Sequence, residues 1–204
     1  MKMEIYTTDS NMNCGPCSLI NMLQIKGSKK LEEQLSEIGR LKPFRASFYS
    51  SFLIWSKRYH KDFQIFTSTK KVSNKMFNLM LQHEKIPFTK QHRYVKLVKD
   101  NLARLNNKYN SQIKNLKNPI TKINELLSKK YLIAVLTSDF YYHNPHPVPH
   151  WIVAFRKKDG KYYFMDSAAK KTEGITTLTS AMLLKGWTIN QRQGFGIQLI
   201  AYKP

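Results

Sequence analysis

The last third of the chain contains the pattern that most restricts its fold. Residues 131–137 (YLIAVLT) are almost uninterruptedly apolar, which is typical of a strand buried on both faces. Residues 150–156 predict a second strand, Lys158-Asp159-Gly160 predicts a tight turn, and residues 161–166 return as the other half of a hairpin. Strands joined by so short a turn pair antiparallel. Any fold of this chain must therefore include an antiparallel sheet built from its C-terminal part.

Helical patterns dominate the residues before this sheet. Phe48, Phe52, Trp55 and Tyr59 recur on one helical face, and we interpret this stripe as core packing. Helices are predicted at residues 14–25, 29–38, 48–59, 73–80, 119–127 and 178–184, and further strands at residues 3–7, 63–69 and 196–202. Because helices come mostly first and antiparallel strands last, the expected class is α+β.

The length of 204 residues suits a single domain over residues 1–204. No segment approaches the roughly 18 apolar residues of a membrane span, and residues 1–6 lack the apolar core of a signal peptide. We therefore expect no membrane span and a cytoplasmic location, where thiols stay reduced.

Basic residues outnumber acidic ones by 34 to 13, for a formal net charge of +21. The excess is densest in residues 85–130, where twelve Lys and Arg face only Asp100 and Glu125. We expect residues 40–130 to form an enlarged basic helical middle region. Its charge is either a solvated helical face or a footprint for an acidic partner such as nucleic acid, an acidic peptide or protein, or a membrane surface. No nucleic-acid-binding motif accompanies it, so nucleic acid would bind only through non-specific charge.

Cys14 is the residue best placed to act as a nucleophile. It follows a polar loop and opens a predicted helix, where unpaired N–H groups and the helix dipole favour the thiolate. Gly15 would let a substrate backbone approach, and Pro16 suits the first helical turn. The second cysteine, Cys17, lies in the same motif, so the chain has no disulfide framework.

A nucleophilic cysteine needs a base and an orienting acceptor. His150 opens a predicted strand, and Asp166 ends the next strand of the hairpin, which places the two side by side. His143 and His146 lie in the preceding loop. A zinc site formed by these three histidines with a cysteine matches no usual ligand spacing, so we expect no metal and no cofactor.

The segments that carry these residues resemble a known family. Residues 13–23 (NCGPCSLINML) resemble the nucleophile helix of the bacteriocin-processing, double-glycine leader peptidases and their stand-alone peptidase-like relatives. Residues 149–155 and 163–166 are similar to the family's His strand and returning Asp strand, and residues 131–142 to the segment before them. The resemblance covers about a third of the chain. The long separation between Cys14 and His150 implies an insertion.

This resemblance implies a papain-like cysteine peptidase fold, with N-terminal helices packed on a C-terminal antiparallel sheet and a helical insertion. It implies a thiol-dependent hydrolase, a peptidase or an amidase or acyl-transfer enzyme, acting on a peptide or amide. Cys14 would be the nucleophile, His150 the general base and then acid, and Asp166 the orienting group.

The family also has a Gln before the cysteine that helps to bind the oxyanion, and no Gln precedes Cys14. Thr8 stands six residues before it, so Thr8, Asn11 and Asn13 are the candidate donors. Candidate substrate-binding residues are Gly15, Trp151 and His146.

Two alternatives remain open. Cys14-Gly15-Pro16-Cys17 is also the motif of thioredoxin-fold thiol-disulfide oxidoreductases, and it follows a predicted strand at residues 3–7. That interpretation leaves His150 and Asp166 without a role. The other alternative is a catalytically idle papain-like module that binds a peptide without cleaving it, as the missing Gln would suggest.

Overall fold

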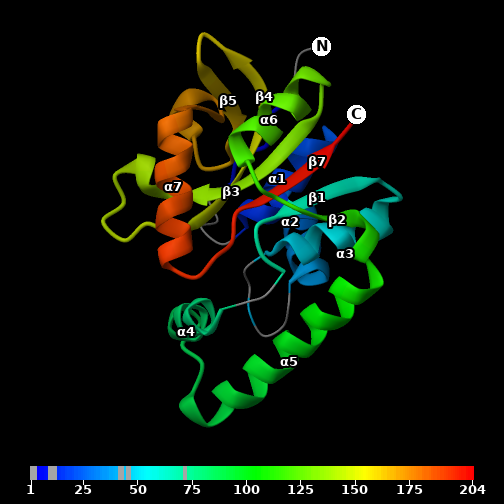
Figure 1. Ribbon diagram of the computed structural model, residues 1–204, viewed down its shortest axis with the longest axis vertical. Helices are drawn as coiled ribbons and strands as arrows, with labels where there is room; N and C mark the ends of the chain where they lie inside the picture. Colours follow the sequence, from blue (N-terminus) through cyan, green and yellow to red (C-terminus); the bar gives the residue numbers. More distant parts are fainter. Residues whose placement is uncertain (1–3, 9–12, 41–43, 45–46, 71–72) are drawn as a thin grey trace.

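A computed structural model describes the chain except for residues 1–3, 9–12, 41–43, 45–46 and 71–72. Its described strands form a seven-stranded sheet in the order β2-β1-β7-β3-β4-β5-β6 (Figure 1). These strands are β1 (Phe63–Thr67), β2 (Ile113–Asn115), β3 (Leu132–Ser138), β4 (Pro149–Lys158), β5 (Lys161–Met165), β6 (Ile175–Thr179) and β7 (Gln198–Tyr202). All neighbours pair antiparallel except β1 and β2, which are parallel. The α+β class is confirmed.

The sheet is buried on both faces because its central strands place apolar side chains alternately on each side. On β3, Ala134 and Leu136 join one core cluster, whereas Ile133 and Val135 join the other. Since successive strand residues point to opposite faces, the uninterrupted apolar pattern of residues 131–137 is explained by two cores.

Helices cover both faces (Figure 1). The first core contains side chains of α1 (Cys14–Leu23), α2 (Lys29–Gly39) and α3 (Tyr49–Tyr59), and the second contains those of α6 (Pro119–Ser128) and α7 (Ser180–Arg192). Helices therefore pack on both faces of the sheet, and the N-terminal helices cover only one of these faces. The predicted helices of the N-terminal half are confirmed, and the Ser28 side chain accepts a hydrogen bond from the N–H of Leu31, as a cap does.

Two helices, α4 (Asn74–His83) and α5 (Phe88–Lys108), extend beyond the end of the sheet, and we call them the helical arm (Figure 1). They have a small core of their own. It consists of Phe44, Phe48, Met76, Phe77, Met80, Leu81, Val98 and Leu102. Only Val98 and Leu102 of the 21 residues in α5 are buried, so most of the basic side chains there are solvated. The middle of the chain also provides β1 and β2 to the sheet and is thus not wholly helical.

Two element predictions were wrong. A strand was predicted at residues 3–7; residue 3 lies outside the described residues, and no strand forms in residues 4–7. This segment instead bonds to α1, where the Tyr6 N–H donates to the Asn21 side chain at 2.7 Å. The C-terminal helix begins at Ser180 rather than at residue 178, because Ile175–Thr179 pairs with β5 as an edge strand. β-Branched residues favour this extended backbone, and the Thr179 hydroxyl then caps the helix.

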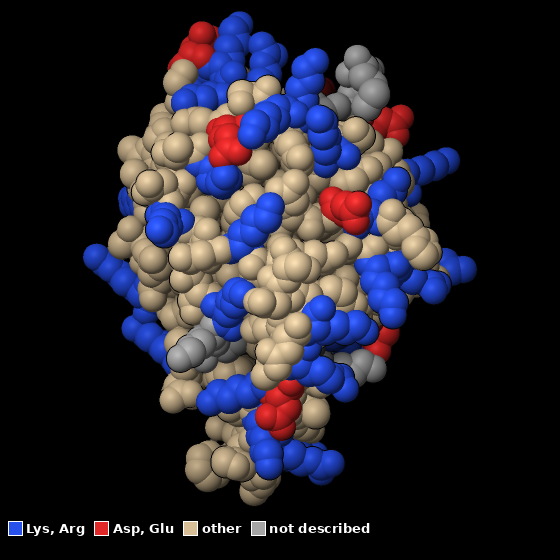
Figure 2. All heavy atoms as spheres, turned by 45° about the vertical axis from the view of Figure 1, so that its right-hand side comes forward, with Lys and Arg blue, Asp and Glu red and all other residues tan. Residues whose placement is uncertain are grey.

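On the face drawn in Figure 2, the basic side chains do not collect in one patch. Figure 2 shows Lys and Arg side chains distributed from top to bottom of the face drawn, with few acidic neighbours. Within the described residues, no helix is both long and apolar enough to cross a membrane.

Candidate active site

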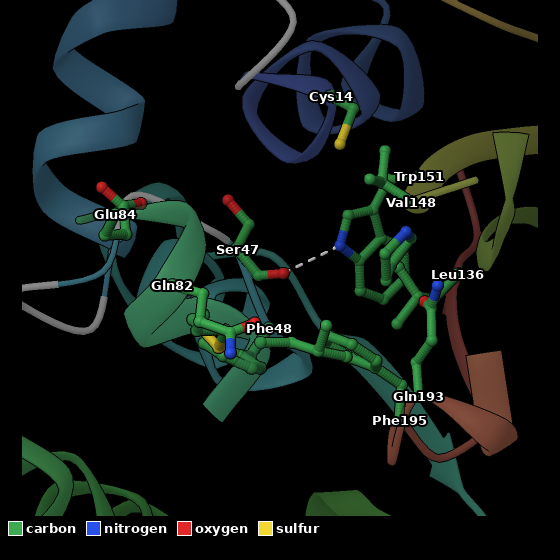
Figure 3. A pocket seen from close by; sticks show the side chains of 13 residues that line it. Cys14, Ser47, Phe48, Gln82, Glu84, Leu136, Val148, Trp151, Gln193 and Phe195 are labelled. Atoms are coloured by element: carbon green, nitrogen blue, oxygen red, sulfur yellow. Dashed lines mark hydrogen bonds between the residues drawn. The ribbon is translucent and has the colours of Figure 1, made fainter. Parts of the chain in front are cut away.

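Cys14 is the first residue of α1, which packs against β4. Its side chain is half-buried, and the sulfur points into a cavity (Figure 3). The first four N–H groups of a helix have no partner within it, so Cys14 stands at the positive end of α1. The sequence predicted this position for Cys14, at the start of a helix.

His150 and Asp166 form a direct pair. His150 is the second residue of β4, Asp166 follows the last residue of β5, and the hairpin places these two strand ends side by side, away from the turn. The distance from His150 Nε2 to Asp166 Oδ1 is 2.8 Å. With Nε2 engaged, Nδ1 is the ring nitrogen that is left for Cys14, which is close enough to be among the groups that raise the pKa of His150. The structure thus brings the three predicted residues together.

Asp166 is completely buried and surrounded by donors. Its Oδ1 accepts from His150 and from the N–H of Ala168 at 3.0 Å. Its Oδ2 accepts from the hydroxyls of Tyr141 at 3.0 Å, Tyr142 at 2.7 Å and Thr176 at 3.1 Å. Five hydrogen bonds fix both the position and the ionised state of this carboxylate.

The electrostatics of the pair follow from this arrangement. Burial alone would lower the pKa of His150, but hydrogen bonding and charge from Asp166, and then from Cys14, raise it to about 10. Burial likewise opposes ionisation of Asp166, yet the charge and hydrogen bond of His150 bring the pKa of Asp166 below its ordinary value. At neutral pH the pair is therefore an imidazolium bound to a carboxylate.

Cys17 has a different environment from Cys14. It is fully buried on the inner side of α1. Burial, together with the charge of Glu32, raises the pKa of its thiol well above the ordinary value. Cys17 is consequently a neutral, packed thiol.

The candidate oxyanion donors lie in the segment before Cys14. The Asn13 side chain donates to buried Glu32 at 2.6 Å, and Glu32 also accepts from the Tyr6 hydroxyl at 3.0 Å. The N–H of Thr8 donates to the carbonyl of Ser167 at 3.0 Å. Asn11 lies outside the described residues. The amide of Asn13 is thus used to hold the start of α1.

The candidate substrate-binding residues have three different locations. Trp151 is buried and lines the cavity beside Cys14, with its Nε1 donating to the carbonyl of Ser47 at 3.0 Å. Gly15 is buried against Ser47, where an added Cβ would come within 2.3 Å of the Ser47 Cβ, so its role here is close packing. His146 is exposed in the loop before β4 and is not among the described cavity-lining residues.

Sequence reasoning missed Tyr141, Tyr142 and Thr176, the three hydroxyl donors to Asp166. The two tyrosines lie on a short 3-10 helix (Asp139–Tyr142) that follows β3, and Thr176 lies on β6, which was not predicted as a strand. The signal available was a pair of adjacent tyrosines directly before the His strand. In the described residues, no group of three or more His, Cys, Asp or Glu side chains is arranged to hold a metal ion.

Comparisons of the chain with protein-family models, with curated proteins and with solved structures found no match.

Proposed function

We propose that this protein is a thiol-dependent hydrolase of papain-like architecture that acts on a peptide or amide through Cys14, His150 and Asp166. The observation that carries the proposal is the buried pair of His150 and Asp166, 2.8 Å apart, beside a cysteine at the first position of a helix. A packing role alone would not require a buried carboxylate held by five donors.

The arrangement supports a balanced sequence of steps. The Cys14 sulfur attacks the substrate carbonyl carbon, and the carbonyl oxygen takes up the negative charge at the free N–H groups of the first turn of α1. The His150 imidazolium then donates its Nδ1 proton to the leaving amine as the C–N bond breaks. Water, deprotonated by the neutral imidazole, attacks the acyl carbon, the C–S bond breaks, and the acid leaves with the Cys14 thiolate restored beside the imidazolium.

The contrast between the cysteines supports hydrolysis over disulfide exchange. A dithiol oxidoreductase needs a second thiol that is accessible enough to resolve a mixed disulfide. Cys17 is fully buried, and burial raises the pKa of its thiol. The redox interpretation expected a strand at residues 3–7, before Cys14. The structure has no strand in residues 4–7.

Iodoacetamide alkylation, followed by mass spectrometry of the two cysteines, tests the proposal. We expect Cys14 to react and Cys17 to stay unmodified in the folded protein. His150→Ala should slow alkylation of Cys14 by about tenfold or more, because an unassisted thiol is only a few per cent thiolate at pH 7.

Cys17→Ala serves as the matched control, because it removes the other thiol of the same helix without touching His150. It should leave the Cys14 rate within about twofold of the wild type. Equal labelling of both cysteines, or a Cys14 rate that is indifferent to His150→Ala, would overturn the proposal. Selective labelling without turnover of any peptide or amide would favour the idle binding module.

A further inference from the structure

The cavity next to Cys14 has the size of a ligand site. Its volume is about 440 Å³, within the range of about 300–1,000 Å³ that is usual for small-molecule sites. The described residues that line it include Cys14, Phe48, Leu79, Met80, Trp151 and Phe195. Figure 3 shows the Cys14 sulfur at one end and side chains of Phe48, Phe195 and Trp151 around the space. A group held there would therefore lie next to the nucleophile.

The walls are mostly apolar, although the chain as a whole is strongly basic. No Lys or Arg is among the described residues that line the cavity, and Glu84 is the charged residue at its wall. Some of the polar groups present are already engaged: the Ser47 carbonyl accepts from Trp151, and the Gln193 Nε2 donates to the carbonyl of Pro147 at 2.7 Å. A buried apolar group would gain here from leaving water, whereas an acidic group would meet apolar walls and Glu84.

The helical arm forms one wall of this cavity. Leu79 and Met80 come from α4, and Glu84 directly follows it. The Ser73 hydroxyl, which caps α4, also donates to the carbonyl of Gly194 at 2.9 Å. This bond ties α4 to the segment that carries Gln193 and Phe195 on the opposite wall. The arm is thereby held in place over the site rather than free in solvent.

We propose that this cavity binds a bulky apolar side chain of a peptide substrate next to the scissile bond, and that α4 determines this preference. The proposal rests on the proposed function of Cys14. It differs from what the resemblance would suggest, because two glycines next to the scissile bond would leave the cavity unfilled.

Electrophilic probes that differ only in one side chain test the proposal. Iodoacetyl-glycinamide, iodoacetyl-leucinamide and iodoacetyl-glutamate amide react alike: the Cys14 sulfur forms a bond to the methylene carbon, the C–I bond breaks and iodide leaves. We expect the leucine probe to alkylate Cys14 at least about tenfold faster than the glycine probe, since one methylene group can change discrimination by about 10-fold or more in a fitting pocket. The glutamate probe should be no faster than the glycine probe.

Leu79→Asp places a charge on the cavity wall at a position that is 37% exposed, so α4 can still fold. It should remove the advantage of the leucine probe, so that the leucine and glycine probes alkylate Cys14 at similar rates. Asn78→Asp, on the exposed side of the same helix, adds the same charge away from the cavity and should change neither rate.

The outcomes separate this proposal from the proposed function. Equal rates for the leucine and glycine probes, or a leucine preference that survives Leu79→Asp, would overturn the apolar site even if His150→Ala slows every probe. If His150→Ala leaves the glycine rate unchanged, the proposed function fails instead. An N-octyl iodoacetamide probe that reacts faster than the leucine probe would assign the cavity to a hydrocarbon chain and overturn the peptide assignment.

Discussion

The site around Asp166 and the helical arm are built in opposite ways. Asp166 is fully buried and accepts five hydrogen bonds from four different segments of the chain. In the arm, α5 spans 21 residues and buries only Val98 and Leu102. One region is fixed by a dense polar network in the body of the protein, and the other by a thin apolar contact at its edge.

This difference fits the division between reaction and substrate selectivity that we propose. Chemistry needs groups held within a fraction of an ångström, which a buried network provides. Selectivity needs a wall that can differ between relatives without disturbing that network, and a helical arm with its own small core suits this requirement. Local stability should accordingly be highest at the sheet and lowest in the arm.

Removal of the Asp166 carboxylate should have the largest effect on stability. Asp166→Ala leaves His150 buried without its partner and four other donors without an acceptor, and loss of one member of a buried pair costs about 3–5 kcal/mol. Urea unfolding measures this change. Glu125→Ala is the control: Glu125 pairs with Lys122 and Lys129 at the surface of α6, and its loss should leave the unfolding midpoint almost unchanged. Similar losses for both variants would contradict the contrast between network and surface.

The arm should respond less and more locally. Leu102→Ala removes one of the two buried apolar side chains of α5 and should cost about 2–3 kcal/mol, at the low end for such truncations because the exposed helix can relax. Amide hydrogen exchange should quicken in α5, while the rate of Cys14 alkylation by iodoacetamide stays the same. Leu97→Ala, on the 45% exposed side of this helix, should have little effect. A slower Cys14 reaction in Leu102→Ala would show that the two regions are not separable.

Neutralising His150 by pH alone should also lower stability, although the neutral ring still donates its N–H to Asp166. The pKa of His150 is raised from 6.5 to about 10 in the folded protein. The native state therefore binds a proton that the unfolded chain releases, and stability from this group is complete below pH 6.5 and lost as the pH rises toward 10. Urea midpoints across this window should fall in the wild type and fall less in His150→Ala. A parallel decline in both proteins would place the titrating group elsewhere.

The sequence predicted most of the local structure and the three residues of the site. Helical spacing located α1 to α4 and α6, and the turn at Asp159-Gly160 located the β4–β5 hairpin that pairs His150 with Asp166. It did not predict β6, because residues 175–179 form a strand only by pairing with β5. Thr176 was missed for the same reason, because it lies on β6, and Tyr141 and Tyr142 were missed because they reach Asp166 from a separate segment that follows β3.

The sequence by itself determined that Cys14 opens a helix and that His150 and Asp166 end neighbouring strands, because helical periodicity, capping and hairpin turns act over short distances along the chain. Only the tertiary structure decided what surrounds them. It buried Cys17 and left Cys14 at the cavity, it gathered five donors on Asp166, and it set α4 opposite Trp151. These differences depend on contacts between segments far apart in the chain, and packing rather than local preference selects them.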